Sequence, residues 1–190
     1  MMSSTTGAVL SDTNYAVIYD LHSHTTASDG RLTPEELVHR AGEMRVGTLA
    51  ITDHDTVDAI PRAQAEIARA GLALQLITGV EISTLWENHE IHIVGLNIDI
   101  ENPTLTAFLS AQIDRRQQRG QMIAERLEKA QIPGAWEAAL KMAEGGAVTR
   151  GHFARFLVEQ GKASNIGDVF KRYLARGKTG YVPPQWCTIK

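Results

Sequence analysis

The sequence contains little cysteine and no long apolar run. Cys187 is the only cysteine among 190 residues, so no disulfide can form within the chain, and a reducing cytoplasm is the favoured compartment. No apolar stretch approaches the roughly 20 residues that a membrane-spanning helix needs. Residues 1–14 are rich in serine and threonine but lack a basic start and an apolar centre. We therefore expect a cytoplasmic protein without membrane contact, preceded by a disordered leader and not by a signal peptide.

Neither charge sign dominates the whole chain, but the two signs are unevenly distributed. Residues 1–149 hold 11 Lys and Arg against 20 Asp and Glu, whereas residues 150–190 hold 8 against 2. The acidic part would suit cations, and the basic part would suit an anionic substrate or simply form a solvated helix face. A content of 43% hydrophobic residues is typical of one globular domain, here with room for an insertion.

Two histidines separated by one residue begin the part of the sequence where chemistry is expected. The run from Tyr15 to Tyr19 is aromatic, β-branched and apolar, which favours a strand. His22 and His24 follow it, and residues i and i+2 of a strand point to the same face. Asp29 comes one short turn later. This set of side chains suits zinc, manganese or iron, although two histidines can also stand at a strand end by chance.

An alternation of helices and strands follows. A capping-box sequence with proline at the first helical position predicts a helix over 33–46. A short apolar strand is predicted over 48–52, a second helix over 57–70 and a third strand over 72–80. Strand, helix, strand is the unit of a parallel sheet, so the fold class predicted is α/β.

Polar residues lie where these strands end. His54 follows the second strand, flanked by Asp53 and Asp55, and Glu81 follows the third. Chemistry in parallel α/β folds collects at the carboxyl ends of strands. Either aspartate could bind or orient a site, and Asp55 could instead begin the next helix. His92 lies in a fourth apolar strand, where a buried imidazole needs either a metal or another polar partner.

From Pro103 the pattern becomes helical. Apolar residues recur on one helical stripe, which predicts a helix that packs along one face. Arg115, Arg116 and Arg119 lie off that stripe and are expected to be solvated. Arg150 precedes a later helix, and helix amino ends attract phosphate, which arginine can bind through two N–H groups.

Taken in order, these segments resemble the polymerase-and-histidinol-phosphatase (PHP) family. The segments that carry the resemblance are Asp20 to Thr25, Ser28 to Gly30, Thr52 to Asp55, Gly79 to Ser83, and His92. Segments 149–154 and 180–183 are similar to one branch, which contains the bacterial 3′,5′-nucleotide bisphosphate phosphatases and ribonuclease AM. The resemblance implies a distorted β/α barrel with a mostly helical insertion.

The resemblance also implies up to three divalent metal ions, manganese first, with iron or zinc as alternatives. The implied ligands are the imidazole and carboxylate side chains near the strand ends: His22, His24, Asp29, His54, Glu81 and His92. By position, His22, His24 and Glu81 would hold one ion and carry the catalysis. Glu81 would bridge to a second ion held also by His92, and the two remaining ligands would hold the third.

The activity implied is metal-dependent hydrolysis of phosphate esters in nucleotides. It would be that of a 3′,5′-nucleotide bisphosphate phosphatase, a 5′-to-3′ exoribonuclease on short RNA, or both. Arg150 and His152 match positions that would contact a substrate phosphate. The partners expected are a nucleotide or a short RNA.

The sequence departs from the family pattern toward its end. Two later family motifs, Ala-His-Pro and Ser-Asp-Phe-His, are missing, and no histidine follows His152. Four strands are predicted, too few to close a barrel, which leaves a sheet edge open. The organisation expected is a leader, the N-terminal part of the barrel, a helical insertion and a truncated return toward the barrel: 1–14, 15–102, 103–180 and 181–190. We expect weak metal binding and little turnover unless a missing segment or a partner completes the barrel.

Three other functions stay open at this point. One is a non-catalytic metal-binding or interaction domain that a partner completes. A second is a phosphatase of the histidinol-phosphate type. The third is a nucleic-acid-binding module that uses the basic region 150–190, which would show a steep salt dependence without a metal requirement.

Overall fold

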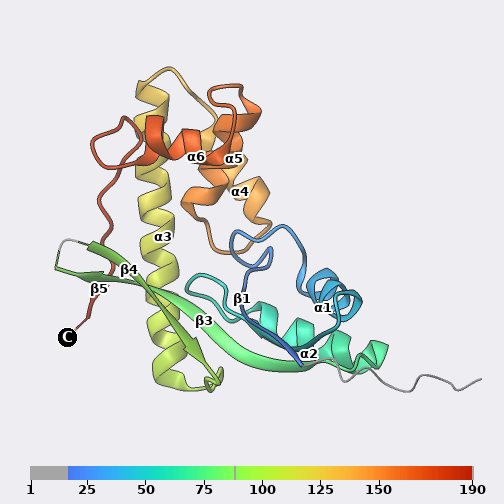
Figure 1. Cartoon of the computed structure of the whole chain (residues 1–190). Coiled ribbons are helices and arrows are strands. Elements are labelled where there is room, and N and C mark those ends of the chain that lie inside the picture. Colours follow the sequence, from blue (N-terminus) through green and yellow to red (C-terminus); the bar gives the residue numbers. More distant parts are fainter. Residues whose placement is uncertain (1–16, 88, 190) are drawn as a thin grey trace, which may run out of the picture.

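The computed structural model describes residues 17–87 and 89–189. A curved sheet carries two helices on one side, and a long helix leads from the sheet into a separate group of helices (Figure 1). The predicted α/β class is confirmed. The predicted leader and the first two residues of the predicted first strand lie outside the described residues. Within those two ranges, no helix is long and apolar enough to cross a membrane.

The described residues form one sheet of five strands. The strands are β1 (Ile18–Ser23), β2 (Val46–Ile51), β3 (Gln75–Trp86), β4 (His89–Leu96) and β5 (Cys187–Thr188). β1, β2 and β3 are parallel neighbours in that order, and β4 pairs with β3 in the antiparallel sense. β5, which was not predicted, pairs with the carboxyl end of β3. The sheet therefore joins residues near both ends of the described chain.

The observed strand bounds move two site residues from the positions predicted. β1 runs from Ile18 to Ser23, so His22 lies inside the strand and His24 directly follows its last residue. β3 continues to Trp86, so Glu81 lies within a strand and not after one. The predicted end of that strand was wrong because its second half pairs with β4 on one side, which extends the ladder past the apolar run.

Helices α1 (Pro34–Glu43) and α2 (Ala59–Ala70) cover one face of the parallel strands. Thr33 caps α1 as predicted, because its side chain accepts from the Glu36 N–H and the Glu36 carboxylate accepts from the Thr33 N–H. The shared core contains residues from both helices and from β2, among them Val38, Leu49, Ile51, Ile60 and Ala63. This packing holds the carboxyl ends of the strands in place.

The helical part has a core of its own. Its elements are α3 (Pro103–Lys129), α4 (Ala135–Ala143), α5 (Arg150–Glu159), α6 (Ile166–Val169) and a π-helical turn (Phe170–Leu174). Ile123 and Leu127 of α3 pack with Phe153 and Leu157 of α5 in that core. The bounds predicted for the leader, barrel and insertion stay predictions.

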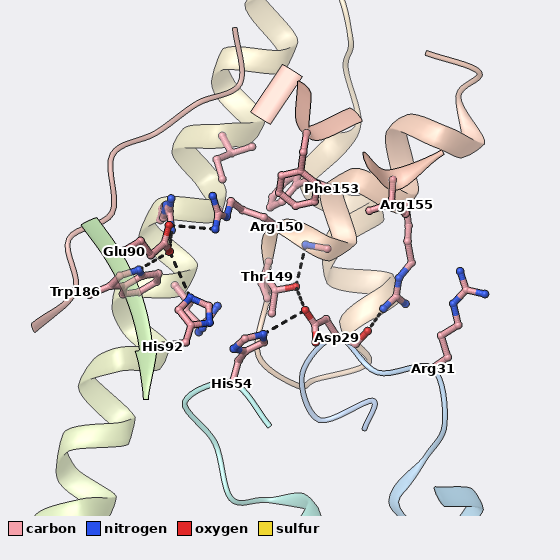
Figure 2. A pocket seen from close by; sticks show the side chains of 18 residues that line it. Asp29, Arg31, His54, Glu90, His92, Thr149, Arg150, Phe153, Arg155 and Trp186 are labelled. Carbon is pink, nitrogen blue, oxygen red and sulfur yellow. Dashed lines mark hydrogen bonds and ion pairs between the residues drawn. The ribbon is translucent and has the colours of Figure 1, made fainter. Parts of the chain in front are cut away.

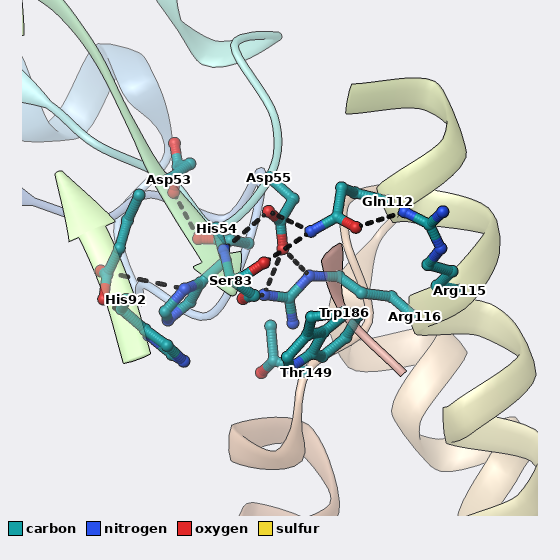
Figure 3. A network of polar contacts seen from close by, with 12 residues as sticks. Asp53, His54, Asp55, Ser83, His92, Gln112, Arg115, Arg116, Thr149 and Trp186 are labelled. Atoms are coloured by element: carbon teal, nitrogen blue, oxygen red, sulfur yellow. Dashed lines mark hydrogen bonds and ion pairs between the residues drawn. The ribbon is translucent and has the colours of Figure 1, made fainter. Parts of the chain in front are cut away.

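A buried polar network attaches α3 to the sheet (Figure 3). Arg116 Nε lies 2.7 Å from Asp55 Oδ2, and Arg116 Nη2 donates to Ser83 Oγ at 2.6 Å. Gln112 donates to the Ser83 carbonyl, and Asp55 also accepts from the Ser83 N–H. The expectation that Arg116 and Arg119 are solvated was wrong, since both are only 7% exposed. A helical stripe could not reveal these contacts because their partners come from the sheet and the chain end.

Candidate metal centre and pocket

A tight loop after β1 positions the first two candidate ligands that lie outside a strand. Asp53 is fully buried and accepts from the Thr25 N–H, the Thr25 hydroxyl and the Ser28 hydroxyl. A Cβ atom at Gly30 would lie 2.3 Å from the His24 carbonyl oxygen, so only glycine fits there. The backbone therefore turns back on itself between His24 and Asp29.

Glu81 lies at the centre of a group of imidazoles. Its Oε2 lies 2.9 Å from His22 Nε2 and 3.0 Å from His24 Nε2, and its Oε1 lies 2.7 Å from His92 Nδ1. His54 Nδ1 is 3.8 Å from the same carboxylate. Four histidines from three parts of the chain thus face one acid.

Asp29 joins this group from the other side. Its two carboxylate oxygens lie 3.4 Å from His24 Nδ1 and 3.5 Å from His54 Nε2. His54 Nδ1 is buried and lacks a hydrogen-bond partner among the described residues. An orphaned imidazole nitrogen at the centre of such a group is a typical feature of a metal ligand seen without its ion.

The surroundings favour the charge states that metal binding requires. Burial would raise the pKa of Asp29, but the hydrogen bond with His54 and the charges of His54 and His24 hold it well below its usual range. The pKa of Glu81 is also lowered, because the hydrogen bond with His22 and the charge of His54 outweigh the raising effect of burial. Burial and the neighbouring His54 lower the pKa of His24. Two ionised carboxylates and a neutral imidazole are what a divalent metal needs as ligands.

The six predicted ligands therefore lie together, and we call them the donor cluster. They make three overlapping groups in which all donor atoms lie within 4.8 Å of one another: His22, His24 and Glu81; His24, Asp29 and His54; His54, Glu81 and His92. Imidazole and carboxylate donors at this spacing fit transition-metal ions. The groups could hold metal ions, and the assignment of each residue to a particular ion stays a prediction.

A cavity of about 420 Å³ lies next to the donor cluster (Figure 2). Asp29, His54 and His92 form one side of it. The remaining lining combines arginines with aromatic and apolar side chains, among them Arg31, Arg119, Arg150, Arg155, Phe153, Phe170 and Trp186. A cavity of this size and composition suits a small anionic ligand with an apolar part.

The two predicted substrate residues lie in different places. Arg150 lines the cavity, where its guanidinium contacts Glu90 Oε2 at 3.1 Å and lies over the Phe170 ring. His152 is only 1% exposed and accepts from the Thr149 N–H through Nδ1. Burial and the nearby charge of Arg155 lower the pKa of His152 to about 4. A direct contact of either residue with substrate stays a prediction.

Thr149 connects α5 to the donor cluster. Its hydroxyl caps the helix by accepting from the Gly151 N–H, and it lies 3.4 Å from Asp29 Oδ2. Arg155 donates to the Asp29 carbonyl. Helix α5 therefore supports a predicted ligand from the side opposite the sheet.

Sequence reasoning missed the part of the pocket that surrounds Glu90. Glu90 accepts from Trp186 Nε1 at 2.7 Å and from Arg119 Nη1 at 3.0 Å, and it also meets Arg150. We call Glu90, Arg119, Arg150 and Trp186 the anchor cluster. Its members are far apart in sequence and follow no motif. The excess of Arg and Lys after residue 149 is the only sequence signal, and it covers Arg150 alone.

Comparison with known proteins decides the family. The PHP domain matches residues 20–182. The chain belongs to the PHP domain family. That span includes all six residues of the donor cluster.

Similar proteins support the assignment to the PHP domain family. The chain is 79% identical over 184 residues to the 5′-3′ exoribonuclease Rnm of Salmonella typhimurium. The aligned residues make up 97% of this chain and 63% of that protein. It is 40% identical to the 3′,5′-nucleoside bisphosphate phosphatase of Chromobacterium violaceum, over 90% of this chain and 60% of that protein. The chain thus spans about three fifths of the length of these curated relatives.

Solved structures support the fold. An amidohydrolase from Chromobacterium violaceum, solved with bound sulfate, superimposes with a TM-score of 0.84 at 40% identity, over 90% of this chain and 60% of that one. A protein from Bifidobacterium adolescentis, proposed to be a metal-dependent phosphoesterase, gives a TM-score of 0.83 at 27% identity, over 92% and 61%. The predicted incomplete PHP-type barrel is therefore confirmed.

Proposed function

We propose that this chain carries part of the site of a metal-dependent phosphoesterase that acts on nucleotides or short RNA. The observation that supports this most directly is the position of the donor cluster beside a cavity that contains several arginines. Ligands for metal cations and arginine N–H groups for phosphate oxygens meet there. Metal-dependent hydrolysis of a phosphate ester requires both. The relatives named as an exoribonuclease and a bisphosphate phosphatase support the same substrate class.

Within this proposal, each part of the donor cluster has a role. His22, His24 and Glu81 would hold one ion, Glu81 and His92 a second, and Asp29 and His54 a third. The bound ions, manganese in our proposal, would supply water that deprotonates near neutral pH and would offset phosphate charge. The Chromobacterium violaceum structure was solved with bound sulfate, an oxyanion similar to phosphate.

The remaining residues bind and orient the substrate. Arg150 can donate to phosphate oxygens while the Phe170 ring lies against its guanidinium. The apolar side chains Ile123, Ile166 and Phe170 line the same cavity and could receive a base. Asp53 and Thr149 hold the loop and the helix that present the ligands.

Barrel completion is also a proposal. Apolar side chains are exposed on β1 and β4, among them Ile18, Tyr19, Ile93 and Val94. We propose that further chain packs against them, so this chain alone binds metal weakly and turns over slowly. In this proposal 15–102 is barrel and 103–180 insertion.

The test is phosphate release with manganese, from 3′-phosphoadenosine 5′-phosphate and from a 5′-phosphorylated oligoribonucleotide. It compares this chain with a version extended to the length of the relatives. We expect release by the extended version, little by this chain, and loss in the extended version when His24→Ala is introduced. His39→Ala is the matched control, because His39 lies on α1 and contacts Glu66, outside the donor cluster. Release that survives His24→Ala would contradict the proposal.

A further inference from the structure

The loop of residues 25–30, which we call the ligand loop, is held between the sheet and the helical part. Asp53 holds it from the sheet side through three hydrogen bonds. On the other side, the Ala147 N–H, shortly before α5, donates to the Ala27 carbonyl at 2.7 Å. A Cβ atom at Gly146 would lie 2.6 Å from the same carbonyl oxygen, so the two backbones meet where no side chain fits. The helical part is therefore docked directly on the ligand loop.

Asp29, in this loop, lies against the first turns of α5. A Cβ atom at Gly151 would lie 3.3 Å from both Cβ and Oδ2 of Asp29. Arg155, one turn further along α5, donates through Nη2 to the main-chain carbonyl of Asp29 (Figure 2). The carboxylate oxygens of Asp29 instead lie 3.4 Å from His24 Nδ1 and 3.5 Å from His54 Nε2. Arg155 thus holds the backbone of this candidate ligand and leaves its carboxylate to the imidazoles.

The charge of Arg155 makes its position informative. The side chain is half-buried and lines the same cavity as Asp29 and His54, where a guanidinium would repel a metal cation. Substrate binding alone does not explain the arrangement, because the Nη2 group is already occupied by the Asp29 carbonyl. A positive charge kept beside a candidate cation site indicates that its hydrogen bond to the ligand loop outweighs the repulsion.

The helical part contacts one group of the donor cluster through its only carboxylate. Asp29 belongs to one of the three groups, and the carboxylate of the other two is Glu81, which lies within β3. All six candidate ligands lie between residues 22 and 92, whereas the contacts with the ligand loop come from residues 146–155. The helical part therefore positions one candidate ligand without supplying any of the six.

We propose that Arg155 is a positioning residue, which fixes Asp29 through its carbonyl for the ion that Asp29 and His54 would bind. The inference rests on the proposed function and deepens it, because one ion position of the proposed centre then depends on the docking of α5. The ion positions that use Glu81 do not depend on this contact. Groups that orient a metal ligand without touching the metal typically change metal affinity by about 10–100-fold.

The experiment measures manganese binding and not turnover. Free manganese is followed by electron paramagnetic resonance during titration of the version extended to the length of the relatives. Arg155→Met keeps a long apolar side chain but removes the donor and the charge. We expect the affinity for one ion to fall at least about 10-fold, while the affinity for the others stays unchanged. Loss of the positive charge alone would act in the opposite direction, because it removes a repulsion.

Two further variants separate position from charge. Arg31 is exposed and lines the same cavity, so Arg31→Met removes an equal charge and leaves the contact with Asp29 in place. Its manganese affinity should be unchanged or higher. Arg155→Lys keeps a donor and the charge, and it should restore part of the affinity that Arg155→Met loses.

A second measurement is independent of metal. Amide hydrogen exchange of residues 25–30 in this chain, with a chelator present, reports how firmly the ligand loop is held. Exchange should become faster in Arg155→Met and stay as in the wild type in Arg31→Met. A thermal melt shows whether each variant is folded, and Arg155→Gln, which is too short to keep the contact, replaces Arg155→Met if that variant does not fold.

The outcomes distinguish this inference from the proposed function. A folded Arg155→Met or Arg155→Gln that binds every ion at least as tightly as the wild type would overturn the inference and leave the phosphoesterase proposal intact. Equal weakening of all ions would also overturn it, because the effect would then be general and not confined to the position of Asp29. An extended wild-type protein that binds no manganese would overturn the proposed function, and the inference with it.

Discussion

The donor cluster and the anchor cluster border the same cavity but are built in opposite ways. The donor cluster comes from short motifs that lie on four successive strands or in the loops directly after them. The anchor cluster takes Glu90 from β4, Arg119 from α3, Arg150 from α5 and Trp186 from the chain end before β5. The first depends on local backbone geometry, whereas the second depends on how the helical part packs against the sheet.

In the proposed function, the donor cluster carries the chemistry and side chains of the helical part bind the substrate. A family that hydrolyses phosphate esters can keep its metal ligands on the strands and alter substrate preference through the helices. Variants in the two clusters should therefore have different effects, which the following experiments test in order of expected size.

The largest effect is expected from breaking the attachment between the helical part and the sheet. Asp55→Asn leaves the buried Arg116 charge without its partner, which should cost about 3–5 kcal/mol of the free energy of unfolding. Asn tolerates the positive φ of Asp55, so backbone strain does not confuse the result. Urea denaturation measures the change. A loss below about 1 kcal/mol would show that other contacts hold α3 in place.

The next largest effect is expected in the pH dependence of stability, which tests the buried His152 in the first turn of α5. The pKa of His152 is about 4 in the folded state against a usual 6.5, so between these values the unfolded chain binds more protons. Stability should therefore rise with pH in this window, and up to about 3 kcal/mol should be lost as pH falls from 7 to below 4. Denaturation curves with chelator, for wild type and His152→Asn, isolate the contribution of this residue. Parallel pH profiles for the two proteins would contradict the lowered pKa of His152.

The third effect concerns the donor cluster alone. Glu81 belongs to two of the three ligand groups, so Glu81→Gln should lower manganese affinity by more than about 100-fold, beyond what loss of an outer-shell partner costs. Calorimetry with manganese measures this, and Glu125→Gln on the exposed side of α3 is the matched control. Bisphosphate binding in the presence of a chelator should not weaken. If it did, the two clusters would not be separable.

The smallest effect is expected from the loop support. Asp53→Asn loses acceptor capacity for Thr25 and Ser28 but removes no ligand, so manganese affinity should fall roughly 10-fold. The same titration measures it. A loss as large as that of Glu81→Gln would mean that Asp53 is itself a ligand.

The outcome for individual residues shows where sequence reasoning worked. Thr33 and Glu36 marked the start of α1 because a capping box involves only four consecutive residues. His22, His54 and Glu81 were found because strand ends in a parallel sheet converge. Glu81 was placed after β3 when it lies within it, since the partner strand β4 decides how far the ladder runs.

Arginines show where it could not work. Arg116 and Arg119 were expected to be solvated, and both are buried. An arginine off the apolar stripe is normally exposed, and burial becomes favourable only where a carboxylate from another segment meets it. Asp55 and Glu90 supply these carboxylates from 61 and 29 residues away, a separation that a helical pattern does not encode.

The sequence by itself determined the α/β class, the family and the six candidate metal ligands, because each rests on local periodicity or on short motifs at strand ends. Only the tertiary structure decided that α3 is joined to the sheet through Asp55, that Glu90 gathers two arginines beside the candidate metal centre, and that one N–H of Arg119 has no partner among the described residues. The physical reason is that buried charges are paired by whichever groups packing brings within about 3 Å of them, and packing is a property of the whole chain.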